Sequence, residues 1–200
     1  MDSTGQGRLI IISGPSGAGK STVVRRLLQA CELPLTLSVS ATTRPPREGE
    51  VNGVDYLFMD QEEFDRRRAA GEFLECKEVF GLGYWYGTPR DQVATGLARG
   101  RWVVLEIDVQ GALAILDREE FDPITLFIHP GGMEELELRL RNRETESEEV
   151  ICARLETALA EMRYMHRYQY EVVNDSVDTA VAEICRILKQ IKEQHPCSKS

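Results

Sequence analysis

Gly14-Pro15-Ser16-Gly17-Ala18-Gly19-Lys20-Ser21 stands between an apolar run at residues 9–12 and a helical pattern that begins near Thr22. The stretch fits the spacing G-x-x-x-x-G-K-[ST]. Between a strand and a helix, such a loop points its backbone N–H groups inward around phosphate oxygens, and the helix adds its positive N-terminal end. The stretch therefore predicts a binding site for the phosphates of a nucleoside triphosphate.

The residue types in this loop each have a chemical role. Glycines permit backbone angles and a close approach that a Cβ would block, Lys20 reaches the β and γ phosphates, and the Ser21 hydroxyl completes a Mg²⁺ shell. The alternative is a glycine-rich turn with a surface lysine, which the flanking strand and helix patterns disfavour. The candidate residues for the triphosphate are Gly14, Pro15, Ser16, Gly17, Ala18, Gly19, Lys20, Ser21 and Thr22.

Composition narrows the possible partners. A chain of 200 residues with 42% hydrophobic content forms one main domain with room for small insertions. Its net charge of −9 opposes binding to nucleic acid or to an anionic membrane. The five cysteines include no C-x-x-C pair, and no secretion signal or membrane-spanning run is recognisable, so we expect a cytoplasmic protein with free thiols.

Strand and helix patterns alternate through much of the chain. Residues 102–107 form a nearly continuous apolar run that ends at Glu106 and Asp108, as is typical of a buried parallel strand. Strands at 124–128 and 171–173 are each followed by a helix. This alternation predicts an α/β fold with a parallel, helix-covered sheet.

Two of the helices have apolar stripes. Thr145 and Glu148 make a capping box for a long helix. Its core face is predicted to comprise Ile151, Leu155, Leu159 and Met162, and that of the last helix Ile184, Ile187, Leu188 and Ile191.

Residues 35–87 break the alternation. Strands are predicted at 37–40, 56–58 and 73–80, and their close spacing indicates an antiparallel meander inserted as a subdomain. Asp60 and Glu63 start a helix that Gly71 ends. Thr88 before Pro89 is expected to cap the next helix.

Arg44 and Arg47 lie three residues apart in a loop stiffened by prolines. Two guanidinium groups at this spacing match one phosphate. The same arginines can instead pair with Glu48, Glu50 or Asp55 on a solvated loop. Spacing alone leaves both readings open.

Several blocks of the chain, in one order, resemble the guanylate kinases, a family of P-loop nucleoside monophosphate kinases. The resemblance spans roughly residues 8–192 and rests on the phosphate loop and on SVSATTRPPR (38–47), FLE (73–75), YGT (86–88), EIDVQG (106–111) and VVND (172–175). It implies an α/β P-loop core (8–34, 89–130 and 156–192), a small mixed α/β GMP-binding subdomain (35–88), a helical lid (131–155) and a tail (193–200).

The family phosphorylates GMP with ATP and Mg²⁺, and dGMP is an expected second acceptor. At matching positions, the resemblance implies Ser21 for the metal and Asn174 for the ATP base. It implies Lys20, Arg44, Arg139, Arg143 and Arg154 as catalytic cations. The implied GMP-binding residues are Arg44, Arg47, Tyr56 and Tyr86 for the phosphate, Ser40, Glu75, Thr88 and Asp108 for guanine, and in addition Glu50.

Some assignments stay open from sequence alone. An ionised Glu75 can accept from N1–H and the 2-amino group of guanine, but it can also pair with Lys77 on an exposed strand. Asp108 or Glu106 can order Mg²⁺ through water, and Tyr84 competes with Tyr86 for one position. A monomer or a homodimer is expected. The rival functions are a non-catalytic binding module, a kinase for another acceptor and a nucleotide-hydrolysing switch.

Overall fold

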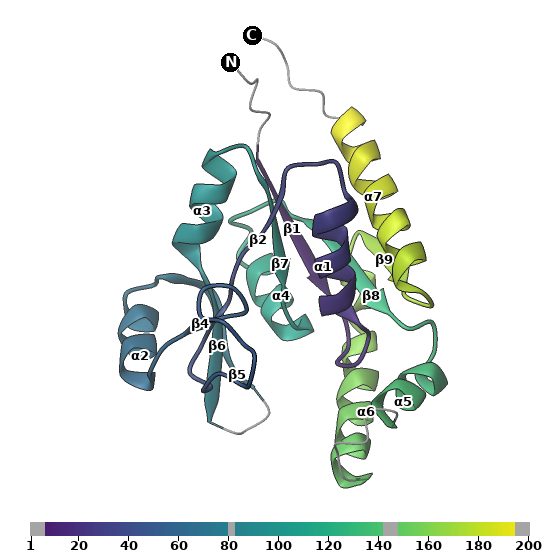
Figure 1. Ribbon diagram of the computed structural model, residues 1–200, viewed down its shortest axis with the longest axis horizontal. Coiled ribbons are helices and arrows are strands. Elements are labelled where there is room, and N and C mark those ends of the chain that lie inside the picture. The colour runs from purple at the N-terminus through teal and green to yellow at the C-terminus, as the bar shows by residue number, and fades with distance from the viewer. Residues whose placement is uncertain (1–6, 80–82, 142–147, 195–200) are drawn as a thin grey trace.

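The computed structural model describes residues 7–79, 83–141 and 148–194, and they form two β-sheets flanked by helices (Figure 1). The larger sheet is parallel throughout, in the order β2-β7-β1-β8-β9. Its strands are β1 Arg8–Ser13, β2 Leu35–Leu37, β7 Trp102–Glu106, β8 Ile124–His129 and β9 Tyr170–Val173. The predicted α/β class with a parallel sheet is confirmed.

Helices cover both faces of this sheet. They are α1 (Lys20–Ala30) and α7 (Val177–Gln194) on one face, and α3 (Arg90–Ala98) and α4 (Val109–Leu116) on the other. Side chains alternate along β1. Ile10 and Ile12 belong to the hydrophobic cluster that includes residues of α1 and α7, and Leu9 and Ile11 belong to the cluster that includes residues of α3 and α4. Burial on both sides explains why the strand is a continuous apolar run. The predicted stripe of α7 is buried as expected.

The second sheet has the order β4-β3-β6-β5 and packs against α2 (Gln61–Ala69). Its strands are β3 Ala41–Thr42, β4 Leu57–Phe58, β5 Phe73–Val79 and β6 Tyr84–Pro89. Phe64 of α2 stacks on Phe73 with ring centroids 4.6 Å apart. The predicted Asp60 cap is confirmed, because its carboxylate accepts from the Glu63 N–H at 2.8 Å.

Three local expectations in this region are wrong. The first strand lies at 35–37 rather than 37–40 and joins the larger sheet, because it pairs in register with residues 102–104 of β7. The second sheet is mixed rather than an antiparallel meander, since the long loop at 43–56 returns the chain so that β4 runs parallel to β3. Thr88 does not cap α3, because β6 continues through Pro89 and the helix begins at Arg90.

Two further helices, α5 (Met133–Arg141) and α6 (Glu148–Met162), pack on each other through Leu136, Leu140, Ile151 and Ala158. Leu159 is 49% exposed, so the predicted stripe is wrong there and Ala158 takes the core position. The capping box expected at Thr145 begins outside the described residues. A short 3₁₀ turn at Met165–Arg167 follows α6. Among the described helices, none is both long and apolar enough to cross a lipid bilayer.

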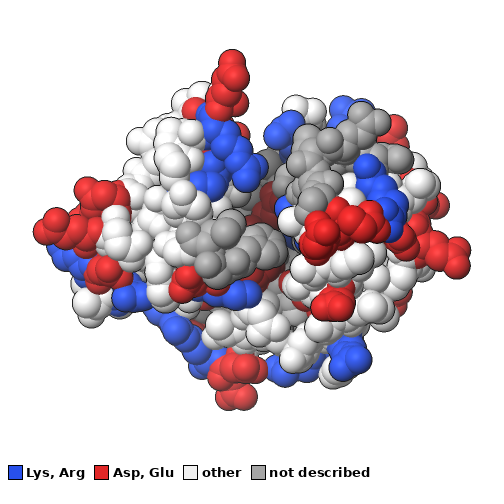
Figure 2. All heavy atoms as spheres, turned by 90° about the horizontal axis from the view of Figure 1, so that it is seen from below, with Lys and Arg blue, Asp and Glu red and all other residues white. Residues whose placement is uncertain are grey.

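The second sheet and the α5–α6 pair protrude from the same end of the parallel sheet, on opposite sides (Figure 1). Figure 2 looks onto this end and shows a hollow between the two protruding parts. The carboxyl ends of β1 and β7 point into it, which is where ligands bind in open α/β sheets.

Candidate active site

The phosphate loop joins β1 to α1 at the carboxyl edge of the sheet. Gly14 has φ +143° and Gly19 has φ +82°, in the region that favours glycine. A Cβ on Gly14 would lie 1.9 Å from the Ile128 carbonyl oxygen of β8, so no side chain fits there. The loop is held against the sheet, and α1 begins at Lys20 with its N-terminus facing the hollow.

Lys20 is folded onto its own loop. Its Nζ donates to the carbonyl oxygens of Gly14 at 2.6 Å and Pro15 at 2.9 Å. Burial lowers the pKa of Lys20, and the carboxylates Glu161, Glu106 and Asp108 oppose this shift. The Lys20 ammonium group is therefore a positive charge among three carboxylates.

Ser21 and Glu106 form a polar pair beside the lysine. The Ser21 hydroxyl donates a short hydrogen bond to the Glu106 carboxylate at the end of β7. No cluster of three or more His, Cys, Asp or Glu suited to a metal occurs in the described part of the chain. Mg²⁺ in phosphoryl-transfer sites needs only one or two protein oxygens besides water and phosphate, and this hydroxyl and carboxylate fit that donor set.

Asn174, predicted to lie near the ATP base, contacts the phosphate loop. It is buried, and its Nδ2 donates to the Ala18 carbonyl oxygen at 2.7 Å. The backbone carbonyl oxygen of Asn174 accepts from Arg139 Nη2 at 2.7 Å, and Arg139 Nε donates to Glu135 Oε1 at 2.7 Å. Asn174 thus links the end of β9, the phosphate loop and α5.

Replacing Asn174 with alanine should raise KM for ATP about tenfold and leave KM for GMP unchanged. The Ala18 carbonyl would lose a buried hydrogen bond worth about 1–1.5 kcal/mol, and the loop would become less well ordered. Steady-state kinetics with each substrate varied in turn measure both constants. Gln190→Ala, which changes an exposed residue of α7, is the control. An equal rise in both KM values would contradict this role of Asn174.

Arg44 forms the centre of a second subsite on the loop after β3. It is 8% exposed, and its guanidinium makes a bidentate pair with Glu50, Nη2–Oε1 2.8 Å and Nη1–Oε2 3.0 Å. Its Nε donates to the Tyr86 hydroxyl at 3.1 Å, and the guanidinium lies over the Tyr56 ring at 5.4 Å. These contacts raise the pKa of Arg44 and lower that of Glu50.

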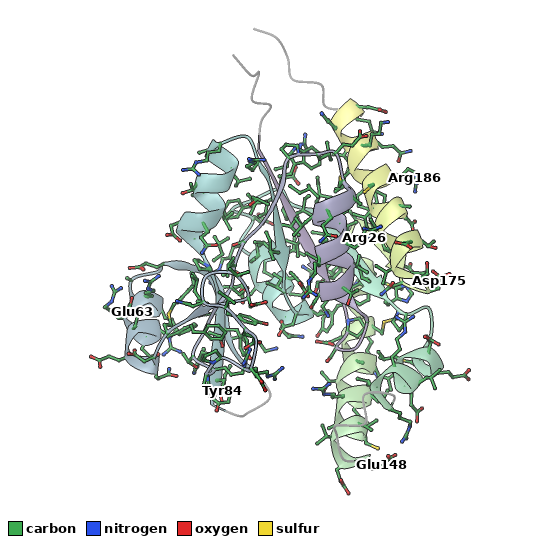
Figure 3. The ribbon with its side chains drawn as sticks, viewed as in Figure 1. Arg26, Glu63, Tyr84, Glu148, Asp175 and Arg186 are labelled. Carbon is green, nitrogen blue, oxygen red and sulfur yellow. The ribbon has the colours of Figure 1, made fainter. Side chains whose placement is uncertain are left out.

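Two questions left open by the sequence are answered here. Arg44 does pair with an acid of its own loop, but the arginine is buried rather than on a solvated surface. Arg47 is exposed, and its backbone N–H donates to Glu50 at 2.7 Å. Tyr86, not Tyr84, contacts Arg44, whereas Tyr84 lies at the far tip of the second sheet (Figure 3).

Glu75 and Asp108 supply carboxylates to the opposite wall. Glu75 is 7% exposed, and its Oε1 accepts from the Thr88 hydroxyl at 2.6 Å. Burial raises the pKa of Glu75 to about 7, although the Thr88 hydrogen bond acts against it. Asp108 caps α4 by accepting from the Gly111 N–H at 2.7 Å. Thr88 therefore orients Glu75 rather than starting a helix.

One cavity of about 450 Å³ connects these groups. Its wall is formed by the phosphate loop, the ends of β7 and α6, and the facing strands of the second sheet. The predicted site residues that line it are Gly14, Ser16, Lys20, Ser40, Tyr56, Glu75, Tyr86 and Asp108. Arg44 and Thr88 lie behind this wall and contact Tyr86 and Glu75, respectively.

The lining residues that sequence reasoning did not assign to the site include the charged side chains Lys77 and Glu161. Glu161 is buried near the C-terminal end of α6, and its Oε2 has no hydrogen-bond partner among the residues that the structure describes. The sequence feature that could have identified Glu161 is its position three residues after Ala158, on the same face of the helix. Arg154 is half-buried on α6, and Arg143 lies outside the described residues.

The fold and the site define a class: a P-loop nucleotide phosphotransferase with a separate acceptor subsite. A family model described as guanylate kinase matches residues 6–191. A guanylate kinase of Rhodopirellula baltica is 64% identical, over 97% of this chain and 93% of that protein. One from Caldanaerobacter subterraneus is 48% identical, over 92% and 87%. The crystal structure of guanylate kinase from Anaplasma phagocytophilum matches with a TM-score of 0.74 at 35% identity, over 92% of this chain and 86% of that one. The chain belongs to the guanylate kinase family.

Proposed function

We propose that this protein transfers the γ-phosphoryl group of ATP to GMP and to dGMP, giving ADP and the corresponding diphosphate, with Mg²⁺ as cofactor. One observation carries the proposal: a single cavity is lined both by Lys20 of the phosphate loop and by Glu75 and Asp108. A donor phosphate and an acceptor base can thus occupy one continuous space.

The carboxylate pair supports guanine as the base. Guanine presents N1–H and its 2-amino group side by side, and Glu75 Oε2 remains available after Thr88 has engaged Oε1. Adenine offers an acceptor at N1 and would leave a buried carboxylate unpaired. Base and phosphate are the same in GMP and dGMP, so residues that recognise only these parts accept both.

Arg44, Tyr56 and Tyr86 are proposed to hold the acceptor phosphate. The acceptor then lies between the second sheet and the phosphate loop, oriented for in-line attack on the γ-phosphorus. The transition state spreads negative charge over the transferred oxygens, and Lys20 supplies a fixed positive charge there. Ser21, with Glu106 beside it, would hold Mg²⁺, which would supply further neutralisation of the phosphate charge.

Residues 131–155 are proposed to act as a lid. The cations that this segment would bring toward the phosphates are Arg139, Arg143 and Arg154. Closure over the hollow would exclude water from the transferred group and so limit ATP hydrolysis.

The test is ADP production from ATP, with and without Mg²⁺, in separate reactions containing no acceptor, GMP, dGMP, AMP, CMP or UMP. Turnover restricted to GMP and dGMP, and abolished by a chelator, is expected. Turnover without an acceptor would indicate a hydrolase, and activity on another monophosphate would overturn the base assignment. ATP binding without any turnover would favour a binding module.

A further inference from the structure

Two carboxylates converge on one point of the acceptor wall. A Cβ built on Gly111 would lie 3.0 Å from Glu75 Oε2 and 3.4 Å from Asp108 Oδ1. The two acids come from different sheets, since Glu75 lies on β5 and Asp108 follows β7. Like charges this close disfavour each other, and Asp108 indeed raises the pKa of Glu75.

Lys77 provides a positive charge at this point. Its Nζ lies 3.2 Å from Asp108 Oδ2, with the two side chains 39% and 35% exposed. Lys77 lies two residues after Glu75 on the same face of β5 and opposite Tyr86 of β6, and all three line the cavity. The ion pair therefore connects the second sheet with the parallel sheet across the acceptor subsite.

We propose that Lys77 is a positioning residue for base recognition: anchored on Asp108, its ammonium group compensates the paired carboxylates and keeps Glu75 ionised as an acceptor for the base N–H groups. The inference rests on the proposed function. It concerns a contact between side chains, and it requires no direct contact between Lys77 and the base.

The other charged groups of the cavity do not replace Lys77. The Lys20 ammonium group is already engaged with the carbonyl oxygens of its own loop, and Glu106 and Glu161 add negative charge. Burial raises the pKa of Tyr56, so this side chain adds no charge near pH 7. Lys77 is thus the cation that lowers the pKa of Glu75 against the effects of burial and Asp108.

The expected pH dependence has a definite sign. Base binding requires ionised Glu75, so GMP affinity rises as pH increases through the pKa of Glu75, about 7. Loss of Lys77 moves this rise to higher pH. A shift of about one pH unit would reduce the ionised fraction at pH 7 from about one half to about one tenth, hence about fivefold weaker binding.

The experiment measures Kd for GMP by calorimetry without ATP, from pH 6 to pH 9. Wild type is compared with Lys77→Met, Lys77→Gln and Lys77→Arg. Lys189→Met, which changes an exposed residue of α7, is the control for loss of one positive charge. We expect Lys77→Met and Lys77→Gln to weaken GMP binding about fivefold at pH 7 and less than twofold at pH 9. Lys77→Arg is expected to bind GMP as wild type does. Titration of the GMP phosphate is common to all variants and cancels in the ratios.

A loss in Lys77→Met that is the same at every pH would mean that Lys77 attracts the phosphate directly, and would overturn the inference. So would a midpoint equal to that of wild type, or a Lys77→Arg variant as weak as Lys77→Met. Failure of wild type to bind GMP at any pH would instead overturn the proposed function. Far-UV circular dichroism of each variant verifies that it is folded.

Discussion

Glu75→Ala is expected to lower kcat/KM for GMP by about 10³-fold while changing kcat/KM for AMP by less than about threefold. A site built to hydrogen-bond particular groups discriminates through the cost of leaving them unpaired. Glu75 is buried and already oriented by Thr88, so its second oxygen is fixed where it can accept from the base. Steady-state kinetics with GMP and AMP on both enzymes measure the ratio.

Glu72→Ala is the matched control, because this neighbouring glutamate is exposed and pairs only with arginines of α2 among the described ion pairs. It should leave GMP turnover within about twofold of wild type, as is typical of surface ion pairs. Equal losses for GMP and AMP in Glu75→Ala would mean that Glu75 stabilises the subsite without reading the base.

The same carboxylate should reduce stability near neutral pH. The pKa of Glu75 is raised from 4.5 to about 7 by burial, so the folded state binds the proton more tightly than the unfolded state. Its contribution to stability is therefore present below pH 4.5 and is lost as pH rises through about 7. Glu75→Gln, which keeps an acceptor for Thr88, should have a higher Tm than wild type at pH 8, with the difference shrinking toward pH 5. A difference independent of pH in thermal scans would contradict this account.

Lys20→Met is expected to lower kcat by about 10³-fold with no change in Kd for GMP. Removing one preorganised donor aimed at developing charge costs about 10²–10³ in rate, and burial strengthens the interaction here. Lys20 is held by the Gly14 and Pro15 carbonyl oxygens, so its charge is positioned before nucleotide arrives. Single-turnover kinetics separate the chemical step from ATP binding.

The control is Lys192→Met, because Lys192 is an exposed lysine near the C-terminal end of α7. It should leave kcat unchanged. A Lys20→Met enzyme with normal kcat and only a raised KM for ATP would show that the lysine contributes to binding but not to the transition state.

The sequence predicted those features that depend on neighbours along the chain. The phosphate loop, the apolar run of β1 and the acids that end β7 are local patterns, and each lies where expected. The Asp60 cap is also local and was correct. Binary pattern and turn chemistry thus sufficed for β1, for β7 and for the glycine-rich loop between β1 and α1.

Distant contacts were not predictable in this way. Thr88 has a cap sequence before Pro89, but its hydroxyl serves Glu75, which lies on the adjacent strand. Lys77 pairs with Asp108, the N-cap of α4, instead of with Glu75. Asn174 contacts a loop more than 150 residues earlier in the chain. Only the packing of the two sheets and α5 brings these groups together, and no periodicity encodes it.

The bidentate pair between Arg44 and Glu50 sets a threshold for ligand entry. An oxyanion that reaches this arginine must displace a carboxylate already held in ideal fork geometry. Chloride and other weakly hydrogen-bonding anions cannot offset that loss, whereas a phosphate dianion with three acceptor oxygens can. Binding of the proposed acceptor phosphate at this loop would therefore exchange one anion for another, and its occupancy would be less sensitive to ionic strength than binding to an unpaired guanidinium.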